Sequence, residues 1–242
     1  MKNTIHFVLQ AKGGIGKSFV STLLAQHLLN EIGAVRCYDT DQENTTFAHY
    51  KALSVKHVVV ADQSRLINPK KFDALMDTLL TEDGDFVIDT GANTFSNFLA
   101  YMVENDVFPM LKEAGKTVYV HTIVGGGDTL ADTANGFNSI ARGIDSTKIV
   151  LWLNEHFGEL KTADGKPFMD TSVYQQNKIK VAGVVTLYKR NAATFGDDIQ
   201  KLNTNRHTIG EATASPDYTL MEKQRIKTFS RDVFDQLRAV PW

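Results

Sequence analysis

The sequence predicts an α/β fold in which a doubly wound, mostly parallel β-sheet is flanked by helices on both faces. Two observations predict this class. Short, continuous apolar runs alternate with amphipathic segments along most of the 242 residues, and such runs are typical of strands that helices cover on both sides. A glycine-rich turn also joins the first apolar run to the first helix. We find no internal repeat and no low-complexity linker, so we expect one domain over residues 1–242.

The expected elements follow in strand–helix order. Strands are predicted at 4–10, 34–39, 56–62, 85–89, 116–124, 148–154 and 180–188. Helices are predicted at 17–31, 69–80, 94–114, 128–142, 192–203 and 217–240. Pro69 suits a first helical turn, Gly33 a C-cap and Asp128 an N-cap. The stretch 155–177 contains Gly158, Gly165 and Pro167 and is expected to be a loop-rich excursion.

Composition and charge set limits on the class of protein. The net charge is −2, but residues 1–172 carry a balance of −6 and residues 173–242 a balance of +4. The basic part is either a nucleic-acid face or scattered surface charge. Cys37 is the one cysteine, so an intramolecular disulfide is excluded and a small buried side chain is expected. No apolar run approaches the roughly 18 residues that span a bilayer, and a strand is expected almost at once, so we expect a cytoplasmic protein.

The turn "GGIGKS" has the chemistry of a phosphate-binding loop. Its backbone N–H groups and the N-terminus of the following helix converge on one place, where the helix dipole favours an anion. Lys17 adds a positive charge at the β- and γ-phosphates, and the hydroxyl of Ser18 is a ligand for Mg²⁺. The residues expected to bind ATP or ADP here are Gly13, Gly14, Ile15, Gly16, Lys17, Ser18 and Phe19.

This loop departs from the usual phosphate-loop motif. The first glycine of G-x-x-x-x-G-K-[ST] would fall on Ala11, and Lys12 follows it. The alternative is a solvated turn with a stray lysine, but the pattern K-G-G-I-G-K-S resembles the deviant Walker A motif of the ParA/MinD family of P-loop ATPases. The resemblance implies that Lys12 reaches across a nucleotide-sandwiched homodimer to the partner's phosphates. Lys17 would hold the phosphates in its own subunit.

Two acidic segments at strand ends also resemble that family. "YDTDQENTT" (38–46) resembles its D-x-D-x-Q segment, which implies that Asp41 orients the attacking water. "FVIDTGAN" (86–93) resembles the Walker B and switch II segment, which implies that Asp89 holds Mg²⁺ and that the Gly91 backbone senses the γ-phosphate. Ser18, Asp41 and Asp89 are therefore the expected metal-site residues. The alternative for these aspartates is capping or turn formation, and for Asp39 the two readings are equally open.

The second segment carries Gly91 where the family usually has proline, and the first lacks a proline after its second aspartate. Both departures concern the rigidity of the switch loops. Asn154 ends its strand, and the resemblance implies that it hydrogen-bonds adenine; a turn residue is the alternative. The loop 186–191 would flank the base. The glycines of 124–133 have no lysine at motif spacing and are interpreted as a loop and helix cap.

The last helix is amphipathic and basic. Its apolar face consists of Ile226, Phe229, Val233, Phe234, Leu237 and Val240. Such a helix can bind a membrane surface, but packing on the sheet is the simpler interpretation. Six other basic residues are candidates for non-specific contacts to DNA phosphates. They are Lys178, Lys180, Lys189, Arg190, Lys201 and Arg206.

Together these features predict an ATP-dependent, dimerising switch ATPase that is slow without a partner. The segments "HFVLQAKGGIGKS" and "LNEHFG" look most like the TraL and StbB-type proteins of conjugative plasmids. The expected role is therefore plasmid partition, stability or conjugative transfer, through a plasmid-encoded partner protein or DNA. The alternatives are a membrane-associated MinD-like positioning ATPase and a ligase of the dethiobiotin-synthetase type. Lys12 argues against the ligase.

Overall fold

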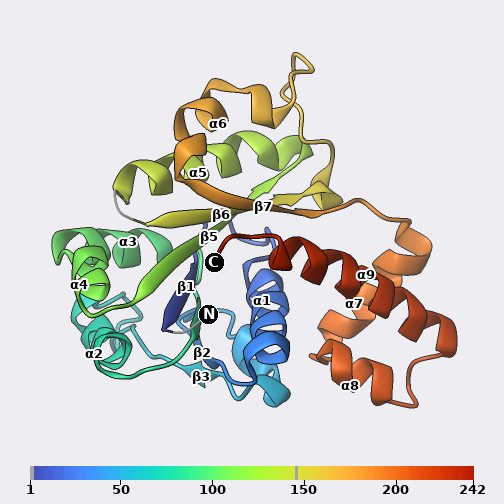
Figure 1. The fold of residues 1–242 in the computed structure, drawn as a ribbon, viewed down its shortest axis with the longest axis horizontal. Coiled ribbons are helices and arrows are strands. Elements are labelled where there is room, and N and C mark those ends of the chain that lie inside the picture. The colour runs from blue at the N-terminus through green and yellow to red at the C-terminus, as the bar shows by residue number, and fades with distance from the viewer. Residues whose placement is uncertain (1–2, 145–146) are drawn as a thin grey trace.

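A seven-stranded parallel β-sheet forms the centre of the protein, which is described here by a computed structural model of residues 3–144 and 147–242 (Figure 1). The strands are β1 (Thr4–Val8), β2 (Arg36–Asp39), β3 (Lys56–His57), β4 (Phe86–Asp89), β5 (Thr117–Gly125), β6 (Lys148–Asn154) and β7 (Val181–Leu187). They pair in the order β3-β2-β4-β1-β5-β6-β7, and every ladder between them is parallel. This confirms the predicted fold class.

Helices cover both faces of the sheet, so alternate residues of each central strand enter different cores. On β1, Phe7 joins the core beneath α2 (Asp73–Thr81), α3 (Phe95–Glu104), α4 (Val107–Glu113) and α5 (Leu130–Gly143). Val8 joins the core beneath α1 (Lys17–Ile32) and α9 (Leu220–Arg238). Burial on both faces explains why these strands are apolar throughout rather than alternating.

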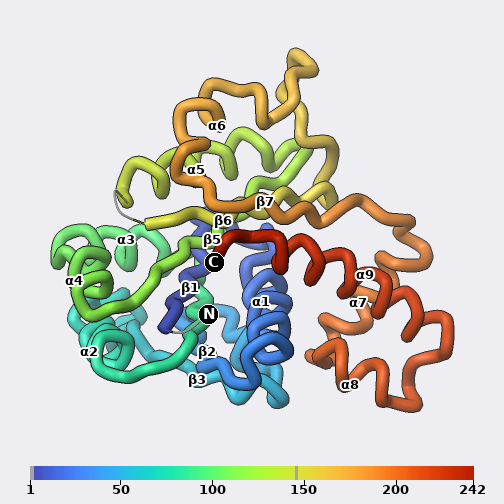
Figure 2. The backbone as a smooth tube through the Cα atoms, viewed as in Figure 1, coloured from blue at the N-terminus to red at the C-terminus, as the bar shows by residue number. Residues whose placement is uncertain are grey.

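Five of the six apolar residues predicted for the last helix pack in this second core, and Ile226 joins a smaller cluster with Leu202, Ala212 and Tyr218. All six of the predicted residues are at most 7% exposed. Figure 2 shows α9 leading back from a group of helices, α7 (Asp197–Thr204) and α8 (Ile209–Ala214), to the middle of the sheet. No helix among the described residues is long and apolar enough to cross a bilayer.

One predicted strand is shorter than expected, because side-chain hydrogen bonds replace regular backbone hydrogen bonds. The strand expected at 56–62 is only Lys56–His57. The side-chain oxygen of Gln42 accepts hydrogen bonds from the N–H groups of Val60 and Ala61, at 3.0 and 3.1 Å, and its amide nitrogen donates to the carbonyl oxygen of Val58 at 2.9 Å. The segment after His57 is thereby fixed without a ladder.

The observed helices differ from the predicted ones in their limits and in their number. The helix expected at 94–114 is two helices, because Asp106 adopts a left-handed conformation with φ 49° between them. Asp128 does not cap α5: it lies in a 3-10 turn (Gly127–Thr129), and the helix begins at Leu130. The helix α8 was not predicted. The excursion 155–177 contains two 3-10 turns and α6 (Ser172–Asn177).

A chain of hydrogen bonds runs through the buried face of three strands. Trp152 Nε1 donates to His121 Nδ1 at 3.0 Å, and an indole can only donate. His121 therefore carries its proton on Nε2 and donates to His6 Nδ1 at 3.0 Å. His6 Nε2 in turn donates to Thr4 Oγ1 at 3.0 Å, and the threonine hydroxyl donates to Asp85 at 2.5 Å. Both histidines are neutral in this arrangement.

These histidines should make the protein less stable in mild acid. Burial, followed by the nearby charge of His27, lowers the pKa of His6 to about 3 from 6.5. A folded pKa below the unfolded value gives stability that is complete above pH 6.5 and is lost as the pH falls towards 3. Between pH 7.0 and 5.5 we expect His6 to cost about 1 kcal/mol of unfolding free energy.

Urea unfolding at both pH values checks this prediction. The variant His6→Gln should lose less stability between pH 7.0 and 5.5 than the wild type does. His49→Gln is the matched control, because His49 lies on the surface and its removal should keep the wild-type pH dependence. An equal pH dependence in wild type and His6→Gln would contradict the prediction.

Candidate nucleotide-binding site

The turn after β1 is shaped by two glycines with left-handed backbones. Gly14 has φ 70° and Gly16 has φ 101°, values that a residue with a Cβ atom adopts only with strain. Gly16 is the N-cap of α1, and no side chain caps that helix. The first N–H groups of α1 therefore lack the side-chain acceptor that usually satisfies them, and an anion could take that place.

Lys17 is buried at the start of α1. Its ammonium donates to the carbonyl oxygen of Lys12 at 3.0 Å, and the residue is 8% exposed. Burial lowers the pKa of Lys17, while the carboxylates of Asp89 and Asp41 act in the opposite direction. A phosphate beside this ammonium would supply the charge partner that its burial requires.

Asp89 ends β4 on the same edge of the sheet. Its Oδ1 accepts from the Ser21 hydroxyl at 2.8 Å, but its Oδ2 is buried without a hydrogen-bond partner. Burial, and then the carboxylate of Asp39, raises the pKa of Asp89 to about 7, and the hydroxyl of Ser18 counteracts this. The unpaired buried oxygen fits a divalent cation that Asp89 and Ser18 would hold.

The described residues contain no group of three or more His, Cys, Asp and Glu side chains placed to hold a metal ion. A magnesium ion is commonly bound by one or two protein oxygen ligands, with phosphate oxygens and water completing its shell. Ser18, Asp89 and Asp41 are compatible with that kind of site.

Asp39 and Asp41 organise the segment after β2. Asp39 is fully buried, and its carboxylate accepts from the N–H groups of Asp41 and Ala48, both at 2.9 Å. Asp39 is therefore a loop anchor. The carboxylate of Asp41 accepts from the N–H groups of Glu43 and Asn44 at 2.9 and 3.1 Å. These bonds leave Asp41 at the cavity wall, where a carboxylate could orient water.

Gly91 allows the two switch segments to approach each other closely. A Cβ atom at this position would lie 2.7 Å from Asp41 Cγ and 2.7 Å from Asn93 Oδ1, closer than real contacts allow. This crowding is a steric reason for glycine at position 91, where the family usually has proline.

A cavity of about 410 Å³ opens beside the loop, within the size range of small-molecule sites. Seven of the predicted residues line it: Gly13, Gly14, Gly16, Lys17, Ser18, Phe19 and Asp41. Its wall also contains residues that the sequence did not indicate, which are Glu43, Asn44, Thr46, Tyr50, Ala92, Asn93 and Asn203, together with Arg206, which was predicted only as a contact to DNA. The last two come from a helix and turn about 190 residues beyond the loop in sequence, a proximity that no local pattern signals.

Asn154 and Ile15 support the loop from behind. The amide of Asn154 donates to the carbonyl oxygen of Ile15 at 3.2 Å, and its side-chain oxygen accepts from the N–H of His156 at 3.1 Å. Ile15 is 1% exposed and belongs to the core beneath α1. In this state the Asn154 side chain fastens the loop, and its contact to adenine stays a prediction.

Lys12 has a partner within its own chain. Its ammonium forms an ion pair of 2.8 Å with Asp132 in the first turn of α5. The two side chains are 43% and 61% exposed, and a surface pair of this kind contributes about 0–1 kcal/mol. The sequence did not indicate this partner, because Asp132 lies 120 residues away.

Gln10, just before the loop, was also missed. It is fully buried and donates to the carbonyl oxygens of Ile123 at 2.7 Å and Thr133 at 3.1 Å. Gly136 leaves the space for it, since a Cβ atom there would lie 2.0 Å from its side-chain oxygen. The glycines of 124–133 pack on the excursion, where the N–H of Gly127 donates to Glu159 at 3.0 Å.

Comparison with known proteins places these features in context. Two Escherichia coli proteins named TraL are 36% and 35% identical over 234 and 238 residues, which is 96% and 97% of both chains. No protein-family model matches the sequence. These relatives confirm the predicted likeness to TraL.

Among solved structures, a chain of the MinC:MinD cell division complex of Aquifex aeolicus covers 99% of this chain and 98% of its own length, with a TM-score of 0.54 and 11% identity. MinD of the same organism gives a TM-score of 0.51 at 11% identity and covers 96% and 97%. At this identity the likeness shows the fold, which is the predicted one.

Adding one methyl group at Gly91 should disturb the site and the fold together. Because its Cβ would overlap Asp41 and Asn93, Gly91→Ala should cost about 1–3 kcal/mol of unfolding free energy, measured in urea. Gly143→Ala is the control: it ends α5, and its Cβ would lie at an ordinary 3.8 Å from Leu99. The control should be neutral or stabilising by up to about 1 kcal/mol. Equal effects of the two substitutions would refute the steric account.

Proposed function

The chain belongs to the TraL family, and from this premise we propose that it is a slow, ATP-dependent switch ATPase that dimerises around its nucleotide. One observation carries the proposal. The uncapped N-terminus of α1, the buried ammonium of Lys17 and the unpaired oxygen of Asp89 gather at one edge of the sheet. The helix has no side-chain cap, Asp89 Oδ2 has no hydrogen-bond partner, and Lys17 donates to a neutral carbonyl oxygen, so the phosphates and the cation of Mg·ATP would supply charged partners to all three.

Within one subunit, catalysis would consist of positioning and charge stabilisation. The N–H groups of Gly13 to Gly16 and the ammonium of Lys17 bind the phosphate chain. Asp41 holds a water molecule in line with the terminal phosphate. Ser18 and Asp89 would hold Mg²⁺, which supplies positive charge to the phosphate oxygens when it is bound.

Lys12 would complete the site of a second subunit. Its ion pair with Asp132 lies near the surface and is weak. A partner's phosphates, with a higher charge than one carboxylate, would compete for the ammonium. Hydrolysis would then be slow in the monomer and would require the dimer, as with a trans-acting arginine finger.

For the cellular role, we propose plasmid partition, stability or conjugative transfer through a partner protein in the cytoplasm. The basic residues proposed for DNA are partly engaged within the chain. Arg190 pairs with Asp232 at 2.6 Å, and Lys201 pairs with Glu222 at 2.9 Å. This favours a protein partner over DNA. The apolar face of α9 is buried within the protein, which speaks against its use on a membrane surface.

The variant Lys12→Ala separates binding from turnover. It should bind nucleotide like the wild type, because Lys17 and the loop are unchanged. It should lose dimerisation and on the order of 10³-fold in turnover, because the trans charge is gone. Light scattering and phosphate release with ATP and Mg²⁺ measure both. Lys51→Ala, a loss of an exposed lysine elsewhere, is the control, and normal dimerisation and hydrolysis by Lys12→Ala would disprove the trans role.

The variant Asp89→Asn should separate function from stability. It removes a buried carboxylate whose Oδ2 has no partner, so the fold should be as stable as the wild type or more stable at pH 8. Mg²⁺-dependent turnover should fall at least about 100-fold. Asp83→Asn, where the side chain is 90% exposed, controls for the charge. Undiminished Mg²⁺-dependent turnover in Asp89→Asn would exclude the proposed metal role.

A further inference from the structure

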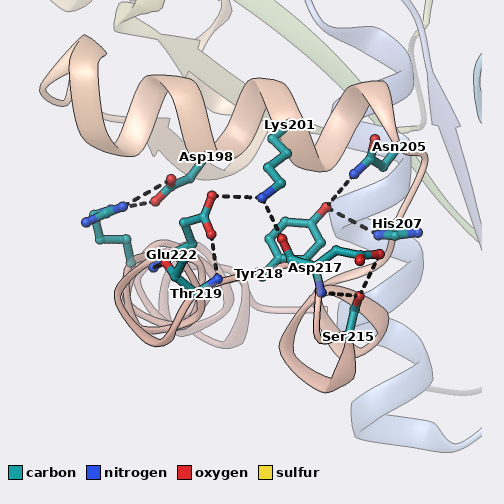
Figure 3. Close-up of polar contacts among 10 residues, drawn as sticks. Asp198, Lys201, Asn205, His207, Ser215, Asp217, Tyr218, Thr219 and Glu222 are labelled. Carbon is teal, nitrogen blue, oxygen red and sulfur yellow. Dashed lines mark hydrogen bonds and ion pairs between the residues drawn. The ribbon is translucent and has the colours of Figure 1, made fainter.

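A polar network, shown in Figure 3, joins α7 and the turn after it to the segment between α8 and α9 and to the start of α9. The ammonium of Lys201 pairs with Glu222 at 2.9 Å and donates to the carbonyl oxygen of Asp217 at 2.7 Å. Asp198 accepts two hydrogen bonds from Arg225, at 2.5 and 3.1 Å. We call residues 197–225 the helical lobe. With both ends of α7 tied to α9, the lobe is a firm support for the turn that it carries.

Tyr218 holds the turn that follows α7 through contacts with two residues of that turn. Its hydroxyl accepts from Asn205 Nδ2 at 3.3 Å and contacts His207 Nδ1 at 3.2 Å (Figure 3). The ring is 2% exposed, and the ammonium of Lys201 lies 4.5 Å from its centre. The residue between these two contacts is Arg206. It adopts a left-handed backbone with φ 53°, a conformation that is uncommon for a residue with a long side chain.

Arg206 lines the nucleotide cavity together with the phosphate loop. Its guanidinium donates to the carbonyl oxygen of Asn203 at 2.7 Å. In the part of the chain that the structure describes, Arg206 forms no ion pair, although the carboxylates of Asp41 and Glu43 line the same cavity. A half-buried guanidinium without a counter-ion gains a strong, charge-assisted contact when an anion enters.

We propose that Arg206 is a further phosphate-binding residue of this site, supplied by the helical lobe to a bound nucleoside triphosphate. The proposal rests on the proposed function. Its strained backbone, held from both sides by Tyr218, presents a planar donor group to a cavity that the phosphate loop also lines. A guanidinium matches phosphate oxygens through two parallel hydrogen bonds.

A separate hydrogen bond links the helical lobe to the segment after β2, which carries Asp41. The hydroxyl of Tyr50 donates to Asn203 Oδ1 at 3.1 Å. Tyr50 is 1% exposed and follows Asp41 by nine residues. A triphosphate bound to Arg206 would therefore be connected to the segment after β2 through Asn203 and Tyr50.

Calorimetric titration with the non-hydrolysable analogue AMPPNP and Mg²⁺ tests the proposal. Arg206→Gln should weaken binding about tenfold or more, since hydrogen bonds to charged groups are the stronger class. Glutamine has no greater backbone strain at this position than arginine. Arg231→Gln is the control, with the same charge change at an exposed position of α9, and should bind like the wild type.

Two further variants keep the test decisive. Tyr218→Phe retains the ring and removes the hydroxyl that holds Asn205 and His207, so it should weaken binding by a smaller factor than Arg206→Gln. Arg206→Lys keeps the charge and loses the planar donor pair, and it should weaken binding even where the glutamine variant fails to fold. Wild-type affinity in Arg206→Lys and Arg206→Gln would overturn the proposal.

Lys17→Ala distinguishes this proposal from the one it rests on. If the wild type binds AMPPNP, Lys17→Ala does not, and Arg206→Gln binds normally, the inference about Arg206 fails and the proposed function stands. If the wild type and Lys17→Ala both fail to bind, the proposed function fails. If Arg206→Gln binds AMPPNP normally but loses co-sedimentation with plasmid DNA, Arg206 serves a nucleic acid and the proposal is overturned.

Discussion

The burial of one ammonium group constrains the whole site. Lys17 is 8% exposed and donates to the carbonyl oxygen of Lys12. A buried cation is costly unless charges and dipoles surround it. The parallel register that pairs Val8 with Asp89 brings a carboxylate to the edge from which the loop departs. The register of β1 and β4 thus brings Asp89 near this lysine, where its charge acts against the effect of burial.

The same constraint explains the backbone around it. For the lysine to turn inward, the loop must fold back over its own carbonyl groups, which requires the left-handed conformations of Gly14 and Gly16. Gln10 braces the strand before the turn by bonding to β5 and α5. The buried carboxylate of Asp89 is left with an unpaired oxygen. An unpaired buried oxygen of this kind costs stability, as is often found at functional sites.

The sequence predicted the sheet and the glycine turn between β1 and α1 well because both depend on local patterns. Strand β6 has the expected limits, 148–154, since its apolar run is bounded by polar residues. Where a side chain from elsewhere acts on the backbone, the prediction failed, as when Gln42 shortened β3. The sequence also did not predict that Lys12 pairs with Asp132 or that Arg206 lines the cavity. Both depend on residues more than 100 positions apart that only the packing of α5 and the helical lobe brings together.

The three cations near this cavity differ in how firmly they are held, and this difference suggests a division of labour. Lys17 is buried, and if its ammonium moved away, the buried carboxylate of Asp89 would lose a nearby positive charge. Lys12 is held by a half-exposed ion pair that is weak enough to be exchanged for a stronger anion. Arg206 is held at its backbone, by Tyr218, while its charged end forms no ion pair among the described residues. A triphosphate would therefore meet one buried charge, one presented by the helical lobe and one that is released only when a stronger anion replaces Asp132.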